Sequence, residues 1–153
     1  MSVNVSFFGN MPDGKEVRLF TIKNSNGIIL QVITLGATLQ ALYTPDKYGR
    51  VNDITVGFDS LYGHLNFTDY QGKVVGRYAN RIANGSFMMN GKKVQLTQNE
   101  RGKTCLHSAG EFSNAVWDAE PVGNNAVADL MPTMEQREYM IKRIREIRSP
   151  QCD

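Results

Sequence analysis

Two polar segments of this 153-residue chain contain side chains suited to holding a hydroxylated ligand. Asn80 and Arg81 lie in the first segment, and His107 lies in the second. Arginine offers a planar fork of hydrogen-bond donors, and asparagine carries a donor and an acceptor on one rigid amide. Histidine can donate to a ring or hydroxyl oxygen and exchanges a proton near neutral pH. These three residues could therefore bind a sugar, although residue types alone favour surface salt bridges and a capping histidine.

Other catalytic and cofactor motifs have weak support. Residues 72–77 lack the Gly-Lys-Ser/Thr ending of a phosphate-binding loop. The two histidines and two cysteines do not have zinc-ligand spacing. Cys105 lies two residues before His107, and alternate residues of a strand share a face, so a cysteine nucleophile paired with this histidine is conceivable but weakly indicated. We expect neither a cofactor nor a metal ion.

Residues 16–122 have the pattern of a β protein, in which short apolar or β-branched runs alternate with turn residues. Asn26-Gly27 predicts a type I′ hairpin turn and Asn90-Gly91 predicts a second hairpin, because Asn-Gly adopts the positive φ angles of this turn with little strain. Gly36 predicts a bend or bulge within a longer run. The expected strands are residues 17–23, 28–34, 37–43 and 53–56, followed by a hairpin across residues 86–96.

A different pattern begins after Val122. Thr133 and Gln136 have capping-box spacing, which predicts the start of a helix. Apolar residues at helical spacing, with charged residues between them, predict an amphipathic helix over about residues 133–148. We expect its apolar face to pack on the body of the protein, and the alternative is a basic helix that binds a partner or a membrane surface. The predicted organisation is a β-strand portion over residues 1–122 and a tail of a different pattern, a loop plus this helix, over residues 123–153.

Composition excludes some partners and indicates a compartment. The chain has 17 Lys and Arg residues against 15 Asp and Glu residues, a formal charge of +2, so we expect no nucleic-acid and no membrane-surface partner. No window approaches the ~18 consecutive apolar residues of a membrane helix, and the first residues lack the pattern of a signal peptide. Cys105 and Cys152 are expected to be free thiols. We predict a cytoplasmic protein with no membrane association.

Five short segments and one tryptophan occur in an order and spacing that are specific when taken together. They include Gly-Arg-Tyr-Ala-Asn-Arg-Ile-Ala at residues 76–83 and Leu-His at residues 106–107, after which Trp117 follows. The others are Ile-Thr-Leu-Gly-Ala-Thr at residues 33–38, Pro-Asp-Lys-Tyr-Gly at 45–49 and Asp-Ile-Thr-Val-Gly-Phe-Asp at 53–59. Through these segments, residues 16–122 resemble the N-terminal portion of the aldose 1-epimerases (galactose mutarotases).

The resemblance implies a fold, an activity and a site. The fold would be all-β, a partial β-supersandwich of the galactose mutarotase type. The activity would be the cofactor-free interconversion of the α and β anomers of aldohexoses such as galactose or glucose. A general base takes the proton of the C1 hydroxyl while a general acid protonates the ring oxygen, and the opened ring recloses on its other face. The sugar contacts would fall on Asn80, Arg81 and His107, with His107 donating near the ring oxygen.

The same resemblance predicts an incomplete site. Family members are longer, and their second active-site histidine and glutamate base lie beyond the part that matches, so we expect a truncated enzyme with weak or no activity. Ser108-Ala109 follows His107 where the family usually has two glycines, which matters if the backbone there needs positive φ angles. The alternative is a non-catalytic sugar-binding or interaction protein derived from a mutarotase. Missing strands would also leave open sheet edges through which the chain could self-associate.

Overall fold

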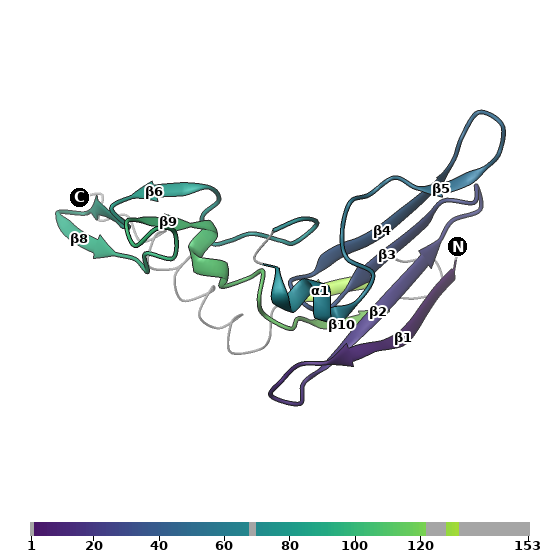
Figure 1. Ribbon diagram of the computed structural model, residues 1–153, viewed down its shortest axis with the longest axis horizontal. Coiled ribbons are helices and arrows are strands. Elements are labelled where there is room, and N and C mark those ends of the chain that lie inside the picture. Colours follow the sequence, from purple (N-terminus) through teal and green to yellow (C-terminus); the bar gives the residue numbers. More distant parts are fainter. Residues whose placement is uncertain (1, 68–69, 122–127, 132–153) are drawn as a thin grey trace, which may run out of the picture.

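A five-stranded antiparallel sheet is the largest element of the protein (Figure 1). The computed structural model describes residues 2–67 and 70–121 in full and residues 128–131 by their backbone. The five strands are adjacent in chain order, and short connections join them into a β-meander. They are β1 (Ser2–Asn10), β2 (Glu16–Lys23), β3 (Ile29–Ile33), β4 (Thr38–Pro45) and β5 (Val51–Asp53).

The turn between β2 and β3 differs from its prediction. A hairpin is present at Asn26-Gly27, but Gly27 alone of these two residues has a positive φ angle, of 82°. The Asn24 side chain explains the difference, because its Oδ1 accepts hydrogen bonds from the N–H groups of Asn26 and Ile28, both at 2.9 Å. These bonds fix a longer turn of the Asx kind, so the prediction of a type I′ turn here is wrong.

Gly36 turns the chain between β3 and β4, as its position in the sequence predicts. Its φ angle is 65°, and a Cβ atom at this position would collide with the backbone of Ser113. The Gly36 N–H donates to the carbonyl of Ala115 at 2.7 Å, so the bend also binds a later segment of the chain. Glycine suits this position because it adopts a positive φ angle with little strain and has no Cβ atom to collide with the neighbouring backbone.

The strand predicted over residues 53–56 is instead β5, which ends at Asp53. The Asp53 carboxylate accepts hydrogen bonds from the N–H of Thr55 at 2.9 Å, from the Thr55 hydroxyl at 2.8 Å and from the N–H of Leu42 at 3.1 Å. The bonds from Thr55 are the main reason that the pKa of Asp53 lies below its usual value. This local side-chain bonding competes with the sheet ladder and ends the strand earlier than its β-branched residues suggest.

The five-stranded sheet is covered on both faces. On one face, α1 (Leu61–Asn66), a helix that the sequence did not lead us to expect, contributes Leu61 to a buried cluster. On the other face, β10 (Asp118–Pro121) contributes Ala119. Burying each large apolar side chain contributes about 1.5–3 kcal/mol, so these clusters hold the sheet and its two coverings together. The first cluster comprises Val17, Ile33, Leu35 and Leu61, and the second comprises Phe20, Ile22 and Ala119.

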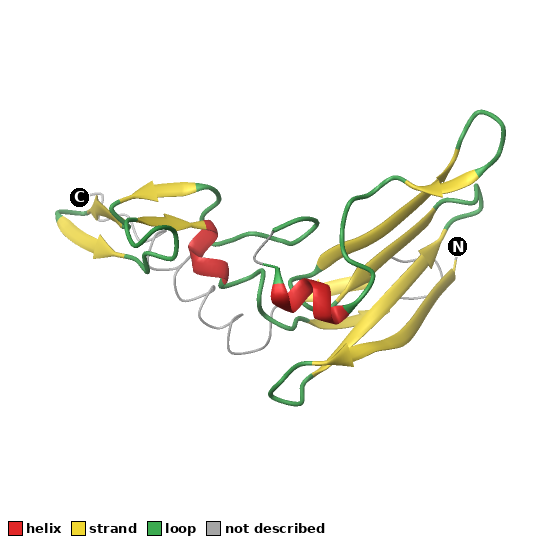
Figure 2. Cartoon of the chain, viewed as in Figure 1, coloured by secondary structure: helices red, strands yellow, loops and turns green. Residues whose placement is uncertain are grey.

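A group of shorter strands lies at the opposite end of the molecule from the sheet (Figure 2). β6 (Arg81–Ala83) pairs with β9 (Thr104–Leu106), and β7 (Ser86–Met89) pairs with β8 (Lys92–Gln95), both antiparallel. Asn90-Gly91 joins β7 to β8 with φ angles of 51° and 73°, which confirms the hairpin predicted there. β9 runs directly into a short 3-10 segment, η1 (His107–Gly110).

The C-terminal part of the chain is described over a short stretch. β11 (Ala128–Met131) pairs antiparallel with β10, and it is a strand that the sequence did not predict. The amphipathic helix predicted over residues 133–148 lies outside the described residues, and the division at residue 122 stays a prediction. The described residues are mostly strands with few helical turns, which agrees with the predicted all-β class.

Candidate functional site

The pairing of β6 with β9 brings Asn80 and His107 together. Arg81 lies opposite Leu106 in this pair, so the residue before β6 meets the residue after β9. The N–H of Asn80 donates to Nδ1 of His107 at 3.0 Å, and the N–H of His107 donates to the carbonyl of Asn80 at 3.0 Å. In a neutral imidazole, a hydrogen bond accepted at Nδ1 places the ring proton on Nε2. His107 can therefore offer an N–H donor to a ligand.

Arg81 directs its guanidinium group toward Glu100. Its Nε lies 2.8 Å from Glu100 Oε2 and its Nη2 lies 2.7 Å from Oε1, a bidentate pair. The hydrogen bond to Arg81 is the main reason that the pKa of Glu100 lies below its usual value, and the same bond raises the pKa of Arg81. Nη1 of Arg81 also lies 3.4 Å from Oδ1 of Asn80. The ion pair thus orients the guanidinium beside Asn80, while the Arg81 side chain stays 58% exposed.

Tyr70 and Asn99 complete the surroundings of His107. The Tyr70 ring lies 4.6 Å from the imidazole, measured between ring centroids. The Asn99 amide donates to the carbonyl of Leu106 at 3.0 Å and accepts from its N–H at 2.8 Å, and its Nδ2 lies 3.5 Å from the Tyr70 hydroxyl. An aromatic face, an amide and an imidazole together suit a ligand that has apolar C–H faces and hydroxyl groups.

Sequence patterns do not single out Tyr70, Asn99 or Glu100. The last two stand in a polar connection without motif spacing, and Tyr70 is an isolated aromatic residue in a loop. One signal was available in principle. Asn99 and Glu100 lie between the predicted hairpin and the segment that contains His107. If that segment pairs with the strand that begins at Arg81, the connection that contains Asn99 and Glu100 must pass close to the site.

The loop that follows His107 has an unusual backbone. The φ angles of His107, Ser108, Ala109 and Gly110 are 50°, 52°, 55° and 80°, all in the left-handed region that favours glycine. The Ser108 hydroxyl offsets part of the free-energy cost of this backbone conformation. It accepts a hydrogen bond from the Tyr78 N–H at 2.7 Å and donates one to the Tyr78 carbonyl at 3.2 Å. The loop therefore adopts positive φ angles even though Ser108 and Ala109 are not glycines.

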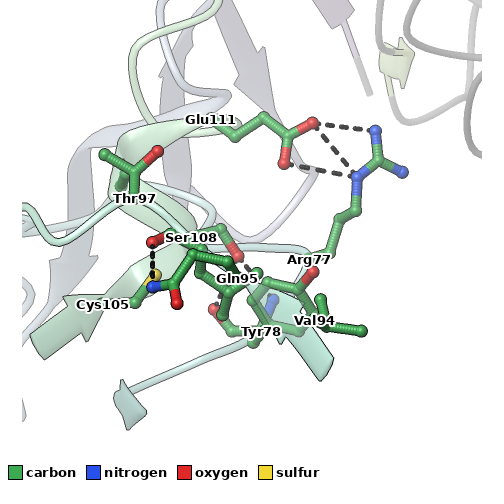
Figure 3. A pocket seen from close by; sticks show the side chains of 10 residues that line it. Arg77, Tyr78, Val94, Gln95, Thr97, Cys105, Ser108 and Glu111 are labelled. Carbon is green, nitrogen blue, oxygen red and sulfur yellow. Dashed lines mark hydrogen bonds and ion pairs between the residues drawn. The ribbon is translucent and has the colours of Figure 1, made fainter. Parts of the chain in front are cut away.

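A pocket of about 250 Å³ lies beside this loop (Figure 3). An ion pair spans one side of the pocket, with Nη2 of Arg77 at 2.9 Å from Oε1 of Glu111. Cys105 and Ser108 also line it, and Cys105 is a free cysteine that is 2% exposed. Among the described residues no hydrogen bond joins Cys105 to His107, so the structure gives no support to a nucleophilic pair of these two residues.

A second pocket, of about 390 Å³, adjoins Tyr70 and Asn99 and extends to His64. His64 is 4% exposed, and its Nε2 lies 2.7 Å from Oε1 of Gln40. Burial, followed by the positive charge of Lys73, lowers the pKa of His64. His64 is therefore kept neutral inside the protein, where it supports α1 against the sheet.

Comparison with known proteins gives the family to which this chain belongs. The family model described as aldose 1-epimerase matches residues 18–139. Galactose mutarotase of Bos taurus is 37% identical over 126 residues, which cover 81% of this chain and 36% of that protein. Aldose 1-epimerase of Haemophilus influenzae is 35% identical over 118 residues, which cover 77% of this chain and 34% of that protein. The chain belongs to the aldose 1-epimerase family.

Solved structures agree on the fold. Galactose 1-epimerase from Lactobacillus acidophilus aligns with a TM-score of 0.67 at 23% identity, over 83% of this chain and 37% of that one. An aldose epimerase homologue from C. elegans aligns with a TM-score of 0.63 at 28% identity, over 78% of this chain and 33% of that one. The chain thus spans about a third of the length of the relatives that it matches.

None of the helices among the described residues has the length and apolar character of a membrane span. The described residues also contain no group of three or more histidine, cysteine, aspartate or glutamate side chains placed to hold a metal ion.

Proposed function

We propose that this chain binds an aldohexose, galactose or glucose, through Asn80, Arg81 and His107, and that it is an aldose 1-epimerase with weak turnover. The observation that carries the proposal is the pair of reciprocal hydrogen bonds between Asn80 and His107, beside an arginine that is already oriented. Membership of the aldose 1-epimerase family supports the same class of substrate.

The geometry suggests a role for each group. Nε2–H of His107 would donate to the ring oxygen, which gains a proton as its bond to C1 breaks. The Asn80 amide and the free edge of the Arg81 guanidinium would hold hydroxyl groups, and the Tyr70 ring would lie against a C–H face of the sugar. The base must take the proton of the C1 hydroxyl at the same time, so that the ring opens to the free aldehyde.

The expectation of weak turnover rests on Glu100, a carboxylate that is paired with a site residue in the described part of the chain. Glu100 is paired with Arg81, and its lowered pKa makes it a poor acceptor for the proton of a hydroxyl group. A positioned acid or base typically accelerates a reaction by about 10²–10⁴-fold, so losing an effective base costs roughly that factor. We therefore propose that the chain is a weakly active epimerase that still binds its sugar.

Two measurements on the full chain test this proposal. Nuclear magnetic resonance titration with galactose and glucose measures binding, and polarimetry of freshly dissolved α-galactose measures mutarotation. We expect saturable binding and a mutarotation rate close to that of buffer. His107→Gln and Asn80→Gly should each weaken binding about tenfold or more, since each removes a hydrogen bond to the ligand worth roughly 1–2 kcal/mol. Glycine at position 80 keeps the observed φ of 65° accessible.

The outcomes separate the alternatives. Arg50→Gln, in an exposed turn of the sheet, is the control and should leave binding unchanged. Binding without any turnover would identify a non-catalytic sugar-binding protein, whereas rapid mutarotation would contradict the weak-turnover part of the proposal. No binding of either sugar would overturn the proposal as a whole.

We place the protein in the cytoplasm, an assignment supported by the free and buried Cys105, which suits a reducing compartment. We keep residues 123–153 as a separate tail, although pairing of β11 with β10 and the family match to residue 139 both cross that boundary. We also expect self-association through open sheet edges.

A further inference from the structure

We propose that β1 is the edge through which two copies of this chain pair, antiparallel, about a twofold axis at Asn4. β1 is the first strand in the order of the sheet, and β2 is its neighbour among the described residues. Figure 1 shows β1 along one margin of the sheet. An edge strand presents a row of backbone N–H and C=O groups that can bind another strand. The proposal names the edge and the partner, and it does not depend on the sugar site.

The sequence of β1 fits a second copy of itself. Residues 2–6 read Ser-Val-Asn-Val-Ser, which is identical in both directions. In an antiparallel pair centred on Asn4, Ser2 lies opposite Ser6 of the second copy, Val3 lies opposite Val5, and Asn4 lies opposite itself. A twofold interface requires a patch that is complementary to itself. The palindrome meets this requirement over five consecutive residues.

The side chains of β1 also suit this pairing. Val3 and Val5 lie opposite Ile22 and Phe20 on β2, and both of those residues belong to the cluster covered by β10. Val5 is 37% exposed, so the apolar face of the sheet continues to its margin. In the pair, Val3 and Val5 of both copies form one apolar row, and cross-strand pairs of β-branched residues stabilise a sheet.

β1 lacks the features that protect an edge. Its nine residues include no charged side chain and no proline, and the bulge between Phe7 and Gly9 lies beyond the palindrome. The opposite edge is β5, which has three residues, follows Arg50 and ends in Asp53. Short strands and charged residues discourage pairing between edges. β1 is therefore the edge of this sheet that favours a second copy.

Sedimentation equilibrium of the full chain, from micromolar to millimolar concentration, tests the proposal. We expect the native sequence to show a monomer–dimer equilibrium. Asn4→Lys places two like charges opposite each other on the twofold axis and should weaken the dimer roughly tenfold or more. Asn4→Asp should have the same effect. An equimolar mixture of the two variants should dimerise again, because lysine then lies opposite aspartate.

The control is Val51→Lys, which places the same charge on the opposite edge at a residue that is 50% exposed and should leave the dimer intact. Asn4 is exposed, so circular dichroism of both Asn4 variants should match the native spectrum. The proposal is overturned by a native chain that stays monomeric or forms open polymers, by a dimer that Asn4→Lys leaves unchanged, or by a variant mixture that stays monomeric. A galactose titration of monomeric Asn4→Lys tests the sugar site independently.

Discussion

Ala109 adopts a left-handed backbone conformation in the loop that carries His107, with a φ angle of 55°. This conformation costs a residue with a Cβ atom roughly 1–2 kcal/mol, and glycine avoids that cost. Glycine also loses more backbone entropy on folding, so we expect Ala109→Gly to raise the free energy of unfolding by about 0.5–1 kcal/mol. Denaturant unfolding measures the change. Ala83→Gly, the same substitution in β6, should instead destabilise the protein, and equal signs for the two variants would contradict this account.

His64 makes stability depend on pH. Its pKa in the folded protein lies below the ordinary value of 6.5, mainly because of burial, so the unfolded chain binds a proton more readily than the folded protein. The contribution of neutral His64 is therefore complete above about pH 6.5 and is lost as the pH falls through the lower, folded pKa. We expect denaturant midpoints to fall over this range in the native protein and to fall less steeply in His64→Gln. Parallel curves for the two proteins would show that His64 is not the responsible group.

At the scale of elements, the bend at Gly36 is the point at which the sheet is most sensitive to one added methyl group. Gly36→Ala adds a Cβ atom at a φ angle of 65° and drives it into the backbone of Ser113, so we expect a loss of about 3 kcal/mol or more. Gly27→Ala is the matched control. It meets the same kind of backbone strain at a φ angle of 82° but in open space, and should cost about 1 kcal/mol. Similar losses in the two variants would show that strain alone, without the close approach, determines the cost.

Local chemistry explains which elements could be predicted from the sequence. The turn at Asn90-Gly91 was predictable because its two flanking runs meet at a two-residue loop. The prediction from the same dipeptide at Asn26-Gly27 was wrong, because the Asn24 side chain accepts hydrogen bonds from the backbone N–H groups of this turn. Asn80 and His107 could be named from sequence motifs, and the structure brings them together, while their role in a site stays a prediction. The ion pair between Arg81 and Glu100 could not be predicted, because this contact depends on how two distant segments pack.

At the scale of the whole molecule, the large sheet and the short strands differ in how much they bury. Val17, Phe20 and Ile33 of the sheet are fully buried, whereas only Gly85 and Cys105 are buried between residues 80 and 106. Regions with few buried contacts open more readily than the core of the same protein. The candidate sugar site therefore lies on the less stable part, where a ligand has the larger effect on local opening.

Amide hydrogen exchange tests this difference and its link to the ligand. We expect amides of β2 and β3 to exchange at least about 100-fold more slowly than those of β6 and β9, since they require the sheet to open. Saturating galactose should slow exchange at Asn80 and His107, whose N–H groups hold the site together, and leave β2 unchanged. His107→Gln should abolish the effect of galactose without altering exchange in β2. Equal protection at both ends of the molecule would show that the short strands are as stable as the sheet, and slowing by galactose confined to β2 would place the ligand elsewhere.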